Sequence, residues 1–178
     1  MAMNKPIFWG LIVLALSVCV FAQKAETMMV KVYFHNEKLN PNQEDCRKVF
    51  PTTRTIPKTS AVARAALDEL FKGTTNEERK KEFWSFPADD TGDIIKSLNV
   101  KNKVAFLDFK KVVFEKLGNT TSSCGGGFYP GIEATLKQFP TVREVVFAVE
   151  GNTNDFYEWV QVGECPHSKK ICSARNFK

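Results

Sequence analysis

The chain has few of the residues that build catalytic and metal centres. It contains two histidines, and its five cysteines include no Cys-x-x-Cys pair. It has no internal repeat, and its longest uncharged apolar run, residues 7–20, is too short to span a bilayer comfortably. These absences make a histidine-based catalytic site, a zinc ribbon and a transmembrane bundle poor explanations of the sequence.

The first 22 residues have the pattern of a secretory signal peptide. Lys5 precedes the apolar run, and Val20-Phe21-Ala22 supplies small residues before a cleavage point at Gln23. We expect residues 1–22 to be removed and the protein to be exported to a periplasmic or extracellular location. Two alternatives are a retained membrane anchor and a lipid anchor at Cys19, although Val18 occupies a position where lipoproteins carry a smaller residue.

Removing 22 of the 178 residues leaves 156, enough for one domain with a real core. Losing Lys5 lowers the formal charge from +5 to +4. Four cations lie in the last ten residues: Lys169, Lys170, Arg175 and Lys178. No alternation of basic and aromatic residues continues upstream, so nucleic acid is not expected as a partner. The basic tail is interpreted as solvated, with contact to an anionic surface as the alternative.

Four cysteines remain after the leader: Cys46, Cys124, Cys165 and Cys172. Four cysteines in an oxidising space allow three complete pairings. The short spacing favours Cys165 with Cys172, which leaves Cys46 for Cys124. The rival is a zinc site of Cys165, His167 and Cys172, but exported thiols tend to oxidise. No metal and no catalytic thiol are therefore expected.

The first half of the mature chain predicts a strand, an extended segment and two helices. Val30, Val32 and Phe34 alternate with polar residues over 28–35, which places His35 on the solvent side. Residues 49–57 are expected to be extended because of their prolines. A helix is predicted from a Ser60 cap to Gly73, and the Thr75 to Glu78 capping box begins a short helix.

The second half predicts a hairpin, a helix and a further strand. Residues 94–100 and 104–109 form the hairpin, and a glycine-rich stretch, 118–131, follows. Ile132, Thr135, Leu136 and Phe139 share one helical face before a strand at 144–150. Residues 155–162 are expected to add an edge strand. The order β-α-β-β-α-β predicts an α+β fold, a small mixed sheet with helices packed on one face.

Several segments together resemble the GerMN domain of sporulation and germination proteins. They are Val30 to Phe34, Arg54 to Pro57, Ala61 to Leu70, Asn102 to Phe109 and Thr135 to Gly151. The resemblance implies a ring-building-motif-like domain at 28–151 and a C-terminal extension with a disulfide-closed basic tail at 152–178. It also implies the Cys46 to Cys124 pairing, no catalytic constellation, no cofactor, and a binding or assembly role with envelope proteins. Thr74 and the run Gly125 to Gly131 depart from the family pattern.

Two hypotheses about the site follow. Phe128 and Tyr129 lie beside three glycines, where burial is hard to arrange, so they are predicted to be surface anchors for a partner. The rival hypothesis is an envelope glycan hydrolase that uses Asp89, Asp93 or Glu115, which would require two carboxylates across a cleft. Phe83, Trp84 and Phe86 are expected to cover the core edge rather than form an exposed patch.

Overall fold

The computed structural model describes residues 26–85, 91–118 and 128–178. The predicted signal peptide and Cys19 lie outside these residues. The strands are β1 Thr27–Asn36, β2 Phe50–Pro57, β3 Phe83–Trp84, β4 Ile95–Lys101, β5 Val104–Phe109 and β6 Glu144–Val149. The helices are α1 Val62–Phe71, α2 Asn76–Lys80, α3 Val113–Lys116, α4 Phe128–Lys137 and α5 Thr153–Trp159, with short 3-10 turns at Pro41–Gln43 and Ala174–Phe177. None of the helices in these ranges is both long and apolar enough to cross a membrane.

The α+β class is confirmed, and the strands are divided between two three-stranded sheets. The first has the order β2-β1-β3 and the second the order β4-β5-β6. β1 pairs antiparallel with β2, which is the segment expected to be extended. β4 and β5 form the predicted hairpin, with Asn102 and Lys103 both at positive φ, and β6 joins β5 in parallel. Each sheet thus contains one antiparallel pair of consecutive strands.

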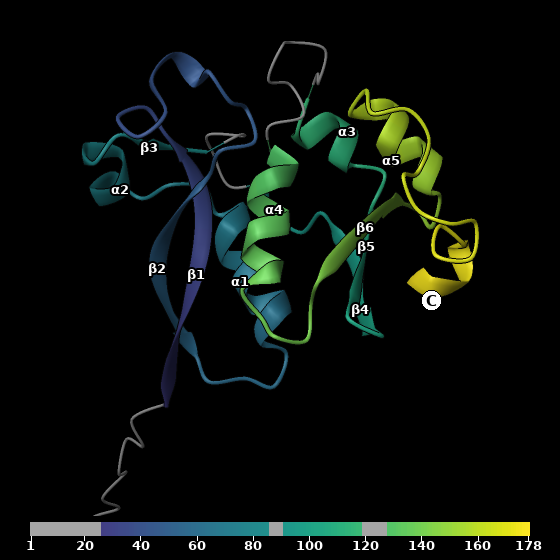
Figure 1. The fold of residues 1–178 in the computed structure, drawn as a ribbon. Helices are drawn as coiled ribbons and strands as arrows, with labels where there is room; N and C mark the ends of the chain where they lie inside the picture. The colour runs from purple at the N-terminus through teal and green to yellow at the C-terminus, as the bar shows by residue number, and fades with distance from the viewer. Residues whose placement is uncertain (1–25, 86–90, 119–127) are drawn as a thin grey trace, which may run out of the picture.

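Helices α1 and α4 lie between the two sheets (Figure 1). α4 approaches β1 so closely that a Cβ on Gly131 would lie 2.7 Å from the Tyr33 carbonyl oxygen, so only glycine fits there. Side chains of α4 also hydrogen-bond to main-chain groups along the edge of β1. Thr135 Oγ1 accepts from the Tyr33 N–H at 3.2 Å, and the Gln138 side chain bonds both the N–H and the C=O of Lys31.

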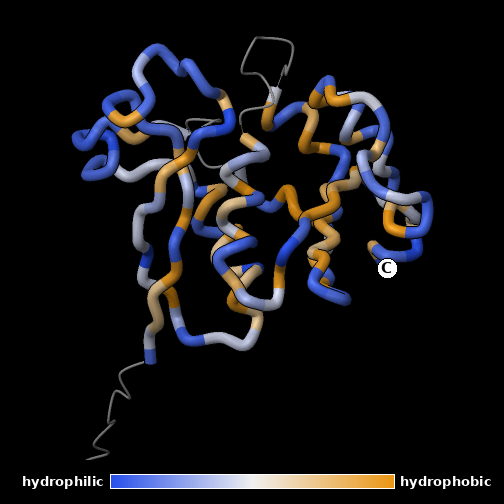
Figure 2. The backbone as a smooth tube through the Cα atoms, viewed as in Figure 1, coloured by the Kyte–Doolittle hydropathy of each residue, from blue (hydrophilic) through white to orange (hydrophobic). Residues whose placement is uncertain are grey.

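The second sheet is covered on both faces. One face packs against α1, α4 and α5, and its largest side chains include Leu107, Phe109 and Phe147. The opposite face is covered by the C-terminal extension, where Phe106 and Val146 pack against Phe177. Figure 2 shows hydrophobic residues along β5 and β6 and a largely hydrophilic C-terminal segment beside them.

Three local predictions are wrong. Residues 155–162 form no edge strand; they lie largely in α5, because the Asn152 side chain caps this helix by accepting from the Asn154 N–H. His35 is not solvated but 5% exposed, because β3 pairs with the end of β1 and places Trp84 over the imidazole, with ring centroids 4.5 Å apart. Ser60 does not cap α1; the N-cap residue is Ala61, whose side chain makes no capping bond.

Candidate functional site

Phe128 does not lie on the surface. It is the first residue of α4 and only 5% exposed, with its ring centroid 5.2 Å from that of Trp159 and 6.3 Å from that of Phe156. The expectation that both rings are displayed to solvent is therefore wrong for Phe128. The helix begins earlier than the predicted Ile132, so its first turn faces α5 and buries the ring.

Tyr129, one residue later, is half-buried and lines a groove of about 290 Å³. Five parts of the chain meet there: α4, β6, α5, the loop that follows α5, and the loop before β2, which supplies Arg47. The lining residues are Arg47, Tyr129, Glu133, Val145, Phe147, Phe156, Tyr157, Val160, Val162, Pro166 and His167. We refer to this feature as the Tyr129 groove.

Aromatic rings form the floor of the Tyr129 groove. Phe147 and Phe156 are stacked with centroids 4.5 Å apart, and Tyr129 meets Phe147 edge to face at 6.3 Å. Burial raises the pKa of Tyr157 to about 12, so its phenol stays neutral at physiological pH. The Tyr157 hydroxyl accepts from the Phe147 N–H at 3.4 Å and so satisfies a main-chain donor of β6.

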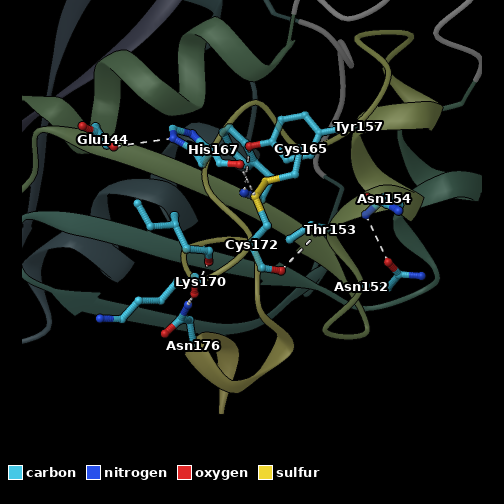
Figure 3. Close-up of a disulfide and its surroundings, with 12 residues drawn as sticks. Glu144, Asn152, Thr153, Asn154, Tyr157, Cys165, His167, Lys170, Cys172 and Asn176 are labelled. Carbon is cyan, nitrogen blue, oxygen red and sulfur yellow. Dashed lines mark hydrogen bonds and ion pairs between the residues drawn. A yellow bond between two sulfur atoms is a disulfide. The ribbon is translucent and has the colours of Figure 1, made fainter.

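A disulfide holds the rim of the Tyr129 groove. Cys165 and Cys172 are bonded, as their spacing predicts, with Cα atoms 6.2 Å apart. The loop that they close carries His167, whose Nδ1 lies 3.6 Å from a carboxylate oxygen of Glu144 (Figure 3). Thr153 at the start of α5 donates to the Cys172 carbonyl, which ties the loop to the helix. Because each sulfur is bonded to the other, the two cysteines cannot serve as the thiolate ligands of the rival zinc site.

The remaining predicted residues are scattered. Cys46 is disulfide-bonded, while Cys124 lies outside the described residues. Asp93 is ion-paired with Lys110 and with Arg64, and its hydrogen bond with Lys110 lowers the pKa of its carboxyl.

Two of the three carboxylates of the hydrolase hypothesis, Asp93 and Glu115, lie in the described ranges. Glu115 is exposed on α3, and neither it nor Asp93 lines the Tyr129 groove. Asp89 and Phe86 lie outside the described residues. Phe83 and Trp84 are half-buried in β3, and Phe83 packs against the core.

Sequence reasoning missed Phe147, Tyr157 and His167 as groove residues. The signal was present for Tyr157, because Phe156, Tyr157 and Val160 have the i, i+1, i+4 spacing of a buried helix face rather than the alternation of a strand. No local signal places His167 near Glu144, since that contact depends on how the disulfide loop folds back onto β6.

Comparison with known proteins identifies the type of domain. A family model described as "Germane: Sporulation and spore germination" matches residues 31–155. No curated protein matches the chain. The first GerMN domain of the sporulation protein GerM from Bacillus subtilis is 19% identical, covering 79% of this chain and 94% of that one, with a TM-score of 0.50.

Two longer or more distant structures are also similar. The tandem GerMN domains of the same Bacillus subtilis protein are 23% identical over 73% of this chain, with a TM-score of 0.49, and this chain spans only 42% of their length. A putative lipoprotein from Clostridium perfringens is 16% identical over 70% of this chain and 75% of that one, with a TM-score of 0.40.

Proposed function

Because the chain belongs to the Germane family of sporulation and spore germination domains, we propose that it is an exported, non-catalytic module that binds or assembles envelope proteins in a bacterium. The leader-like residues 1–22 and the cysteine content support export. The Tyr129 groove is the single observation that supports a binding role, because it presents an aromatic floor with a polar rim.

The chemistry of the groove favours binding over catalysis. Two of its charged or titratable groups have partners within the fold: Glu133 is 3.3 Å from Lys137, and His167 lies beside Glu144. Tyr157 is held neutral and accepts a main-chain hydrogen bond. Paired charges around buried rings suit an interface that excludes water, where Tyr129 is the accessible anchor.

The experiment compares capture by the wild-type protein and by two variants at one position. Tagged full-length protein is expressed in its native host, crosslinked and purified from the envelope fraction, and partners are identified by mass spectrometry. Tyr129→Ala removes the ring, whereas the matched control Tyr129→Phe keeps it. If Tyr129 is an interface anchor, Tyr129→Ala reduces recovery of the wild-type partner about tenfold or more, while Tyr129→Phe retains most of it.

Equal recovery by Tyr129→Ala, with an unchanged melting temperature, would exclude the groove as the binding site. The export part of the proposal is tested separately by sequencing the N-terminus of the purified protein. A chain that begins at Gln23 supports signal cleavage, a lipid-modified Cys19 supports the lipid anchor, and an intact Met1 in the membrane fraction supports the retained anchor. An intact Met1 on protein recovered from the cytosol contradicts export.

A further inference from the structure

The edge strands of the two sheets differ in whether their outward main-chain groups have hydrogen-bond partners. α4 bonds the free edge of β1 through Thr135 and Gln138, and the Tyr157 hydroxyl accepts from β6. β2 is an edge strand that carries prolines at positions 51 and 57, a usual protection against further pairing. β3 is an edge strand of only two residues. β4 is the remaining edge, with β5 as its one strand neighbour.

The turn of the β4–β5 hairpin determines which main-chain groups of β4 point outward. Asn102 and Lys103 form a two-residue turn, so Lys101 and Val104 are a hydrogen-bonded pair. Pairs alternate along an antiparallel ladder, so the N–H and C=O groups of Leu98 and Val100 point away from β5. Within residues 26–85, 91–118 and 128–178, no hydrogen bond to these outward groups is found.

An apolar groove of about 460 Å³ adjoins this edge. Leu98 and Val100 line it from the strand, the start of α1 forms the facing wall, and the turn after α4 closes one end. The lining residues are Ser60, Ala61, Val62, Ala63, Arg64, Leu98, Val100, Phe139, Pro140 and Thr141. Val100 is 40% exposed, which is high for a valine in a strand. A strand added beside β4 would direct every second side chain into this groove.

Three cations lie at the turn end of the groove. Lys101, Lys103 and Arg143 are exposed, and the Arg143 N–H donates to the Lys103 carbonyl at 2.7 Å, which brings β4's turn and the start of β6 together. None of the three forms an ion pair with another described residue. In contrast, Lys96 at the opposite end of β4 is paired with Glu150 at 2.5 Å and lies 3.6 Å from Asp108.

We infer that β4 and this groove form a second binding surface, which accepts an extended segment of a partner protein by strand addition. The segment runs antiparallel to β4 and bonds the outward groups of Leu98 and Val100. Its alternate residues are apolar and enter the groove, and acidic residues at its N-terminal end meet the three cations. A second copy of this chain fits less well, because β4 itself contains no acidic residue to meet those cations.

The inference is independent of the Tyr129 groove, and peptides test it directly. The probe is a pool of ten-residue peptides that begin with two aspartates and then alternate threonine with valine, isoleucine, leucine or phenylalanine. Binding to the whole protein is followed by hydrogen exchange and by titration. Expected results are slower exchange at the Leu98 and Val100 amides and affinity that falls as salt increases.

Two controls separate strand addition from general adhesion. A peptide from the bound set is methylated on the main-chain nitrogens that face β4, which leaves the protein and the peptide side chains unchanged, and its affinity should fall at least tenfold. Lys101→Glu with Lys103→Glu should weaken the unmethylated peptide by a similar factor. The inference is overturned if methylation leaves the affinity of the peptide unchanged, or if no peptide of the pool binds. It is also overturned if the peptide slows hydrogen exchange only in residues of the Tyr129 groove. A dimer whose β4 amides are protected without peptide overturns it as well.

Discussion

The two sheets bury their strands in different ways, although each has three strands. In β1, Val30 and Val32 are buried while Met29 and Lys31 are exposed, so only one face is covered until the strand reaches His35, where Trp84 covers the other. In β5 and β6, every residue after the first is buried. Alternation of apolar and polar residues thus corresponds to a strand in a sheet with one solvated face. A continuous apolar run, such as Val145 to Val149, corresponds to a strand in a sheet that is covered on both faces.

The two faces of the β4-β5-β6 sheet are covered by different kinds of structure. Helices α1, α4 and α5 cover one face with a large cluster of buried side chains. The other face has a small cluster around Phe106, Val146 and Phe177. Most of this cover lies beyond residue 155, where the family match ends, and it includes the disulfide loop. If packing determines stability, the helix side should contribute more to the free energy of unfolding than the C-terminal cover does.

The largest loss of stability is expected from the helix side. Leu136 is fully buried on α4, so Leu136→Ala should lower the free energy of unfolding by about 2 to 5 kcal/mol through lost burial and a residual cavity. Urea unfolding measures it. The matched control is Met29→Ala, at a side chain that is 74% exposed on the first sheet, where the change should stay within about 0.5 kcal/mol. A loss below about 1 kcal/mol at Leu136 would contradict the packing.

Removing the disulfide from the C-terminal cover should have the next largest effect. Cys165→Ser with Cys172→Ser opens a short loop, and the chain-entropy model gives a loss of about 2.5 kcal/mol. Because Phe177 and Ile171 pack on the face of the sheet opposite to α4, hydrogen exchange should accelerate in residues 165–178 and remain slow in α4. Equal acceleration in α4 would mean that the two covers unfold as one unit.

Much of the fold could be predicted because the signals are local. The Asn102-Lys103 turn, the Thr75–Glu78 capping box and the inward residues Ile132 and Leu136 are all present. The wrong predictions arise where a segment distant in the sequence determines whether a residue is buried. His35 is buried by Trp84, which is brought by β3 from far along the chain, and the alternation of β1 gives no warning of it.

The candidate site was harder to predict than the fold. Tyr129 was identified for its neighbouring glycines, yet its groove is formed with β6, α5 and the disulfide-closed loop, all of which lie far along the chain. Phe128 was misjudged because sequence periodicity placed the start of the helix at Ile132. The boundary of a helix is poorly fixed by periodicity alone, and here it determines which of two adjacent rings is buried.

A smaller and pH-dependent effect is expected in the first sheet. Arg54 on β2 bonds both carboxylate oxygens of Glu78 at 2.9 and 2.5 Å, and the Thr75 N–H donates to the same carboxylate. Burial raises the pKa of Glu78, but these bonds outweigh it and hold the pKa below its usual 4.5. The stabilisation is therefore present above pH 4.5 and is lost as the pH falls through the lowered pKa.

Glu78→Gln keeps the shape and some hydrogen bonds but removes the charge, so it should cost about 1 kcal/mol at neutral pH. Urea unfolding of wild type and variant at a series of pH values should show the difference shrink towards zero as Glu78 becomes protonated. A difference that stays constant into acid would show that the carboxylate charge is not what stabilises the sheet.

The smallest effect at neutral pH is expected at the β6 edge, where Tyr157→Phe removes one hydroxyl and leaves the ring in place. Its hydrogen bond with the Phe147 N–H is long, at 3.4 Å, so the loss should stay below about 1 kcal/mol. Wild type and Tyr157→Phe should differ more clearly at alkaline pH. Burial raises the pKa of Tyr157 to about 12 from its usual 10.0, so the folded state holds this proton more tightly than the unfolded state does.

By linkage, stability from Tyr157 is complete below pH 10 and declines as the pH rises from about 10 to about 12. Tyr157→Phe should lack this part of the decline, so wild type and variant converge or cross in urea unfolding above pH 10. A spectrophotometric titration of the folded wild type should likewise show one phenol that ionises near pH 12 and is missing from the variant. Parallel alkaline curves would mean that the Tyr157 hydroxyl is solvated, and that the edge of β6 is as open as the edge of β4.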